Sequence, residues 1–91
     1  AALDGFSKAL ALEVASRGIR VNTVNPGMVN TGILDRTSIS QDQLEEDVKN
    51  YPLKRYGKTS DIAYAVIYLL SDAAEWITGT SLLIDGGFTL K

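Results

Sequence analysis

The stretch VNTVNPGMVNT, residues 21–31, decides how the fold of this chain is interpreted. Its first half is rich in β-branched residues, and together with the residues before it this pattern predicts a strand over 19–25. Pro26 and Gly27 are expected to end the strand, because proline has no N–H to donate to a β-ladder. Small polar side chains surround the corner that follows. We therefore expect a tight corner with an accessible backbone directly after a strand.

The remaining elements follow from helical spacing and turn residues. In order, we expect a helix over 1–17, the strand over 19–25, a polar loop, a mostly solvated helix over 41–50, a buried helix over 62–70 and a short apolar strand over 81–84. Gly18 is expected to end the first helix, and Asp85, Gly86 and Gly87 to form a turn after the last strand. Thr59 or Ser60 is expected to cap the buried helix.

The first helix is predicted to be amphipathic. Its apolar face is expected to contain Leu3, Phe6, Leu10 and Val14, opposite a polar stripe of Asp4, Ser7 and Lys8. Glu13 falls within the apolar face, where an unpaired carboxylate is costly. We expect Glu13 to form a structural ion pair with Arg20 rather than to act as a catalytic acid.

Two strands joined through a buried helix form a βαβ unit with parallel strands. Parallel sheets are covered by helices on both faces, and a sheet of two strands is marginal in water, so further strands are expected from elsewhere. The predicted fold class is therefore α/β, with residues 1–91 forming the end of a larger, doubly wound parallel sheet.

The composition removes several classes of function. The chain has 91 residues without cysteine or histidine, so it contains no disulfide framework, no histidine- or cysteine-based metal site and no Ser-His-Asp or Cys-His nucleophile. The absence of cysteine favours a cytoplasmic location. A net charge of -2 argues against a nucleic-acid partner, and the apolar runs are shorter than the roughly 20 residues that cross a membrane.

The corner after Asn25 is the candidate binding site, since ligands of open parallel sheets bind beyond the carboxyl ends of the strands. Gly27 is expected to let the backbone approach a flat ligand, and the main-chain groups of Met28 and Val29 are expected to be free to bond a carboxamide. Thr31 adds a hydroxyl suited to an amide or phosphate oxygen. Without further signals, the Pro-Gly pair favours an ordinary strand-ending turn over a ligand site.

Four blocks in order carry a resemblance to a known family: AALDGFSKALALE at the start, NPG followed by Thr31, SDIAYAVIYLLSD, and WITG with the later DGG. They resemble the short-chain dehydrogenase/reductase family, and most of all its 3-oxoacyl-[acyl-carrier-protein] reductases. The resemblance implies a Rossmann-like doubly wound parallel sheet, of which this chain supplies the last two strands and flanking helices. Residues 1–91 are then the C-terminal segment of a single NAD(P)-binding domain.

The family also implies a reaction, in which a tyrosine assisted by lysine and serine protonates a carbonyl while NAD or NADP exchanges hydride. No Tyr-x-x-x-Lys pattern occurs here, and by resemblance the lysine would immediately precede Ala1. No catalytic residue is therefore predicted in this chain, which alone should be inactive. The resemblance assigns cofactor binding to Pro26, Gly27, Met28, Val29 and Thr31.

The implied substrate is a small-molecule or acyl-thioester carbonyl compound, such as a 3-oxoacyl thioester, and the implied assembly is a homo-oligomer, either a dimer or a tetramer. Ile33 and Leu34 fall in the family's mobile lid, where they either reach substrate or make a packing contact. Tyr64 and Tyr68 are expected to pack or to form an interface. The alternative function is a non-catalytic oligomerisation or interaction module.

Overall fold

The computed structural model describes residues 2–30 and 40–90. In chain order the elements are α1 (Ala2–Val14), η1 (Ala15–Arg17), β1 (Thr23–Pro26), β2 (Val29–Asn30), α2 (Gln41–Val48), β3 (Gly57–Lys58), α3 (Thr59–Leu70), η3 (Asp72–Ala74), β4 (Ser81–Ile84) and η4 (Phe88–Leu90). This order confirms the predicted succession of helix, strand, helix and strand. Thr31, Ile33 and Leu34 lie outside the described residues.

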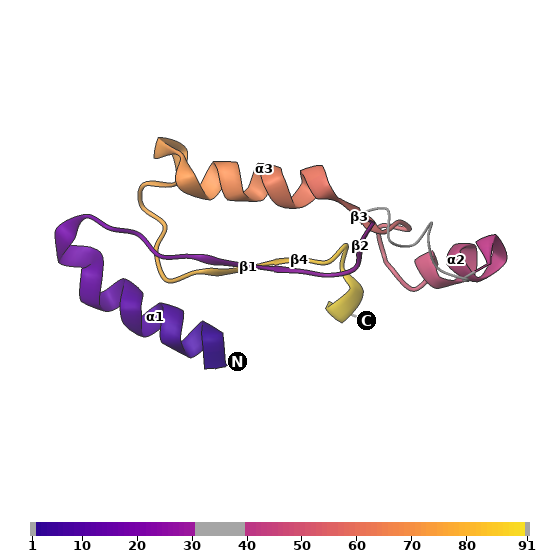
Figure 1. The fold of residues 1–91 in the computed structure, drawn as a ribbon, viewed down its shortest axis with the longest axis horizontal. Helices are drawn as coiled ribbons and strands as arrows, with labels where there is room; N and C mark the ends of the chain where they lie inside the picture. Colours follow the sequence, from indigo (N-terminus) through magenta and orange to yellow (C-terminus); the bar gives the residue numbers. More distant parts are fainter. Residues whose placement is uncertain (1, 31–39, 91) are drawn as a thin grey trace.

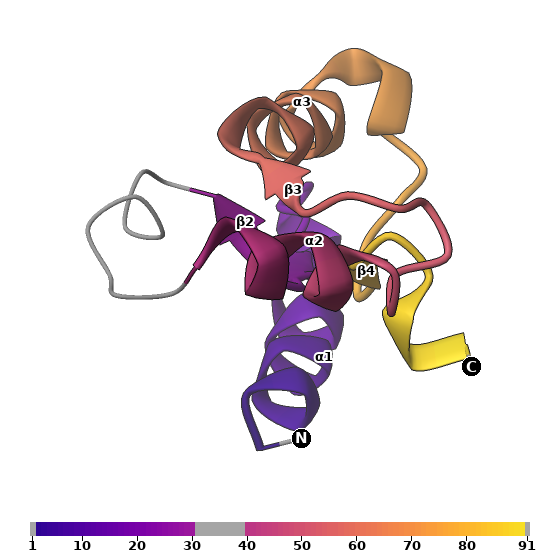
Figure 2. The ribbon, with the colours of Figure 1, turned by 90° about the vertical axis from the view of Figure 1, so that its right-hand side faces the viewer.

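β1 and β4 form a parallel ladder in which Thr23 pairs with Ser81 and Pro26 with Ile84. α3 lies on one side of this ladder and α1 on the other, as Figure 1 and Figure 2 show. The predicted parallel sheet of an α/β fold is therefore confirmed. A second parallel ladder joins β2 to β3 beyond the carboxyl end of β1, and α2 lies at that end of the molecule (Figure 1).

The boundaries of the first strand differ from the prediction at both ends. β1 begins only at Thr23. Before it, the side chains of Arg20 and Asn22 both donate to the carbonyl of Ile77, at 3.2 and 3.1 Å, and replace part of a regular ladder. β1 runs one residue further than predicted and has Pro26 as its last residue. A terminal proline is compatible with a ladder because only its own N–H is missing.

The predicted ion pair between Glu13 and Arg20 is wrong. Arg20 donates to the carbonyls of Ile77 and Ser71, at 3.2 and 3.4 Å, and so fastens the start of β1 to the segment before β4. Glu13 is exposed. A carboxylate in contact with water needs no buried partner, so the physical reason for the pair disappears.

The predicted apolar face of α1 is only partly its packing face, since Leu10 and Val14 are half-buried. Ser7 and Ala11 are buried, whereas Leu3 and Phe6 are exposed. Small side chains allow the helix to approach the turn before β4, where a Cβ built on Gly79 would lie 3.7 Å from the Cβ of Ala11. The end of α1 is as predicted, since Gly18 has a left-handed φ of 73° and its N–H bonds the carbonyl of Ala15.

α3 is less buried than its composition predicts. Leu69 is its buried residue, whereas Tyr64 and Leu70 are 71% and 77% exposed. The Cα radius of gyration is 16.2 Å, against about 12 Å for a compact domain of this length. The apolar surface of α3 is therefore uncovered because two strands offer it too little sheet. Within residues 2–30 and 40–90, no helix is long and apolar enough to span a membrane.

Candidate functional site

The corner at residues 25–29 lies where the sequence places it, at the carboxyl ends of β1 and β4 (Figure 1). Pro26 closes β1, and the N–H of Gly27 extends the ladder by donating to the carbonyl of Ile84 at 2.8 Å. Met28 is exposed, and Val29 begins β2. The structure thus brings four of the five predicted cofactor-binding residues into one corner, and the fifth, Thr31, falls outside the described residues.

Packing within the chain requires glycine at position 27, and the approach of a ligand to its backbone stays a prediction. A Cβ at this position would lie 2.9 Å from the Cβ of Asp85 and 3.0 Å from its Cα. Real Cβ atoms do not approach other atoms so closely. The glycine therefore allows the corner to pack against the end of β4, and close approach of a ligand is not needed to explain it.

The carbonyl of Met28 is not free, contrary to the prediction. It accepts a hydrogen bond from the N–H of Gly57 at 2.9 Å, at the start of the ladder between β2 and β3. At Met28, therefore, the carbonyl is already engaged, whereas the N–H has no hydrogen-bond partner within the described ranges.

A cavity of about 180 Å³ lies beside the corner, at the carboxyl edge of the two strands. Its apolar wall comes from Met28, Leu53 and Ile84, and its polar rim from Arg55 and Asp61. The cavity is smaller than the typical site of a dinucleotide, so it could hold only part of such a ligand. Within the described residues, no group of three or more carboxylates, histidines or cysteines is arranged to hold a metal ion.

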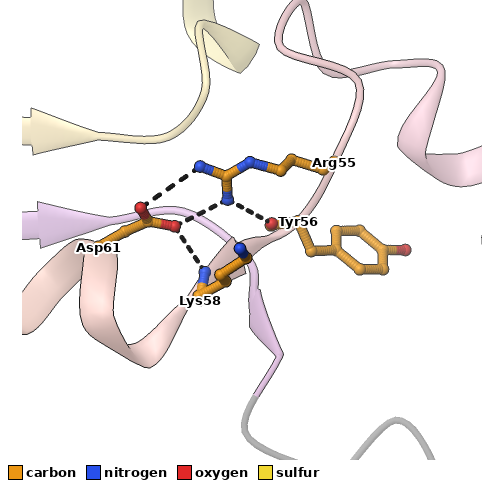
Figure 3. A network of polar contacts seen from close by, with 4 residues as sticks. All are labelled: Arg55, Tyr56, Lys58 and Asp61. Atoms are coloured by element: carbon orange, nitrogen blue, oxygen red, sulfur yellow. Dashed lines mark hydrogen bonds and ion pairs between the residues drawn. The ribbon is translucent and has the colours of Figure 1, made fainter.

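Arg55 and Asp61 form the principal charged pair near the corner, as Figure 3 shows. The two guanidinium nitrogens lie 2.7 and 3.3 Å from the two carboxylate oxygens. Asp61 also accepts from the N–H of Lys58 at 2.7 Å, so it caps α3 in place of the predicted Thr59 or Ser60. These contacts, that with Arg55 foremost, lower the pKa of Asp61 to about 2.

Sequence reasoning missed this pair. The signal was an acidic residue at the third position of a helix, where a side chain can reach back to the N–H of the residue before the helix. Its partner Arg55 lies six residues earlier, across the short strand β3, and no periodic pattern relates the two. The carboxylate alone could therefore have been predicted as a cap, but not the two-point contact.

An aromatic cluster joins the segment before β3 to the C-terminal turn. The rings of Tyr51 and Phe88 have centroids 4.9 Å apart, and Tyr51 and Tyr56 meet edge to face at 5.6 Å. The hydroxyl of Tyr56 donates to Asp47 on α2, and this bond raises the pKa of Tyr56 to about 12. Asp47 is exposed, as predicted, but it also tethers α2 to the aromatic cluster.

Comparisons with known proteins agree with this fold. A family model described as Enoyl-(Acyl carrier protein) reductase matches residues 1–89. A crystal structure of a short chain dehydrogenase family protein from Francisella tularensis superposes with a TM-score of 0.84 at 36% identity, over 99% of this chain and 41% of that one. The chain therefore belongs to the short-chain dehydrogenase/reductase family, as the four sequence blocks predicted.

Curated relatives include two different activities. A 3-oxoacyl-[acyl-carrier-protein] reductase, FabG, of Haemophilus influenzae is 47% identical over 92 residues, which cover 100% of this chain and 37% of the relative. A cyclohexanol dehydrogenase of an Acinetobacter species is 40% identical over 89 residues, which cover 98% of this chain and 34% of the relative. The chain thus spans about a third of the length of these curated relatives.

Proposed function

We propose that residues 1–91 form the C-terminal segment of a single NAD(P)-binding Rossmann domain and contribute the nicotinamide side of its cofactor site. The observation that carries the proposal is the position of the corner at residues 26–29, at the carboxyl ends of two parallel strands in a chain of this family. Ligands of open α/β sheets bind at such edges.

The main chain of the corner fits a carboxamide in one respect. The N–H of Met28 is a donor without a partner among the described residues, and its side chain is exposed, so a carbonyl oxygen of a ligand can reach it. The engaged carbonyl of Met28 leaves the acceptor role to Val29 or to Thr31. A bound nicotinamide cofactor would supply or accept hydride. The residues of this chain would hold and orient its carboxamide.

The proposed reaction is reduction of a carbonyl to an alcohol, with a 3-oxoacyl thioester or a similar ketone as substrate. The identity to FabG supports the thioester, whereas the cyclohexanol dehydrogenase supports a smaller cyclic ketone. Because this chain has no Tyr-x-x-x-Lys pattern, the proton donor is proposed to lie in a segment that precedes residue 1 in the full-length protein.

The test compares two proteins: the 91-residue chain and the full-length polypeptide that carries it. Each is assayed with NADH and with NADPH against acetoacetyl thioester and cyclohexanone. We expect the full-length protein to oxidise one nucleotide with at least one ketone, and the 91-residue chain to show no turnover. Turnover by the isolated chain, or no nucleotide binding by the full-length protein, would refute the proposal.

A second candidate function is a non-catalytic interaction module, which the exposed apolar residues of α3, such as Tyr64 and Leu70, favour. This function predicts self-association of the full-length protein that nicotinamide nucleotides do not alter, and no nucleotide binding. Sedimentation velocity with and without nucleotide, together with the binding assay, separates the two functions.

A further inference from the structure

The pair of Arg55 and Asp61 is connected to the proposed cofactor corner by a short series of contacts. The guanidinium of Arg55 also donates to the carbonyl of Tyr56 at 3.1 Å, while Asp61 accepts from the N–H of Lys58 (Figure 3). The pair therefore fastens both ends of the Tyr56–Gly57–Lys58 segment to the first turn of α3. In Figure 3 the ring of Tyr56 points away from the pair, and Arg55 bonds only the main-chain carbonyl of Tyr56.

The segment that is held in this way contacts the corner directly. The N–H of Gly57 donates to the carbonyl of Met28 at 2.9 Å, and Val29 pairs with Gly57 in the ladder between β2 and β3. A Cβ built on Gly57 would lie 3.5 Å from both the Met28 oxygen and a methyl carbon of Val29. These distances are ordinary van der Waals contacts, so it is the hydrogen bond and the ladder pairing that pass a shift of residue 57 on to residues 28 and 29.

The pair is poorly placed to serve stability alone. The side chains of Arg55 and Asp61 are 47% and 32% exposed, and exposed ion pairs contribute little to folding. Its geometry is nevertheless specific, since both oxygens of the carboxylate meet the planar fork of the guanidinium and each partner also bonds the main chain. Such a two-point contact fixes the orientation of the two side chains relative to each other, which a lysine in place of Arg55 would not do.

We propose that Arg55 and Asp61 are positioning residues for the nicotinamide corner: through the Gly57 N–H they hold the main chain of Met28 and Val29 in the geometry that receives the carboxamide. This inference rests on the proposed function. Neither side chain is assigned a contact with cofactor or substrate. The ionised state of Asp61 that the pair requires persists at neutral pH, because the pKa of Asp61 is about 2.

The test uses the full-length protein that carries residues 1–91 and measures the dissociation constant of NADH and of NADPH by nucleotide fluorescence. The variants are R55M, D61N and the double variant R55M/D61N. The matched control is K8M, which removes the lysine from the exposed Lys8–Asp4 pair on α1, where the two charged groups lie 3.1 Å apart. Unfolding midpoints in urea are recorded for every protein.

We expect R55M and D61N each to weaken nucleotide binding roughly 10-fold or more, since small displacements of positioning groups have effects of this order or larger. The double variant should be no weaker than either single variant, because both act through one contact. The KM for nucleotide should rise, while the KM for ketone at saturating nucleotide stays unchanged. The urea midpoint of R55M, which leaves the Asp61 cap of α3 in place, should shift no more than that of K8M.

Nucleotide binding by R55M and D61N equal to that by K8M would overturn the inference, as would losses that add in the double variant. If R55M does not fold, the nucleotide affinity of R55K is compared with that of K8M instead, because lysine keeps the positive charge but lacks the planar guanidinium. If the wild-type protein binds neither nucleotide, the proposed function fails and the inference fails with it. If the wild type binds and the variants bind equally well, only the inference fails.

Discussion

Replacing Gly27 by alanine should destabilise the protein, because the corner has no room for a methyl group. The added Cβ would lie 2.9 and 3.0 Å from the Cβ and Cα of Asp85, whereas carbon atoms in contact normally lie about 3.5–4.0 Å apart. Neither atom of Asp85 can be moved by rotating a side chain. The strain must therefore be relieved by shifting the corner away from the end of β4.

The magnitude follows from two opposing terms. Overpacking by one methyl group against a rigid neighbour costs about 1–3 kcal/mol. Alanine also reduces the conformational entropy of the unfolded chain, which stabilises the folded protein by about 0.4–1 kcal/mol where alanine can adopt the native backbone conformation. Gly27 has no positive φ, so this gain applies. The expected net loss in the free energy of unfolding is about 1–2 kcal/mol. Gly27→Ala should also lengthen the bond from the Gly27 N–H to the carbonyl of Ile84.

The assay is urea unfolding of the full-length protein followed by circular dichroism, with Gly5→Ala as the matched control. Gly5 lies inside α1, and a Cβ built on it meets no atom within 4 Å. Alanine there should stabilise by about 0.5–1 kcal/mol, because glycine is a poor helix former. The two substitutions should thus have opposite signs. A Gly27→Ala protein as stable as the wild type would refute the packing explanation of the corner.

Three further substitutions test other contacts. Asn22→Ala removes the side-chain hydrogen bonds to the Ile77 carbonyl and the Thr80 N–H, and should lower the free energy of unfolding in urea by about 1–2 kcal/mol. A loss below about 0.5 kcal/mol would contradict this prediction. Tyr56→Phe removes the hydrogen bond to Asp47, which requires the protonated hydroxyl. The pKa of Tyr56 is about 12 in the folded protein and about 10 in the unfolded chain, so the stability difference between wild type and variant should be full below about pH 10 and should vanish as the pH rises through 12. A stability difference that does not change with pH would contradict this prediction. Ser40→Ala removes the side-chain oxygen that caps α2, and this should lower the stability of the helix by about 1 kcal/mol. The loss should be measurable as faster amide exchange in residues 43–46, and unchanged exchange would exclude a capping role.

The sequence predicted best those features that single residues determine. Gly18 ends the first helix because its φ of 73° is open to glycine, and the turn at Asp85 follows the last strand as expected. The parallel pairing of β1 and β4 follows from the helix between them, since parallel strands need a crossover. The position of the corner at the carboxyl edge is a consequence of that topology.

The packing faces of the helices were not predictable in the same way. Periodicity identifies which positions are apolar, but burial depends on which surfaces are present to cover them. In α1 the buried residues are Ser7 and Ala11, and the small side chain of Ala11 allows the helix to approach the turn at Gly79. In α3 the tyrosines remain exposed because the described sheet has few strands.

The structure also changes the interpretation of the Pro-Gly pair, for which a plain turn and a ligand site were alternatives. The conformation of the corner is explained by contacts within the chain: Asp85 limits the space at Gly27, and Gly57 engages the carbonyl of Met28. These contacts are all made by the chain's own residues, so a cofactor that bonds the remaining Met28 N–H would not have to supply them. Preorganisation of this kind favours binding because less conformational freedom is lost. The turn and the proposed site are therefore one structure, and substitutions at residues 27, 57 and 85 should affect stability and nucleotide affinity together, whereas Gly5→Ala should affect stability alone.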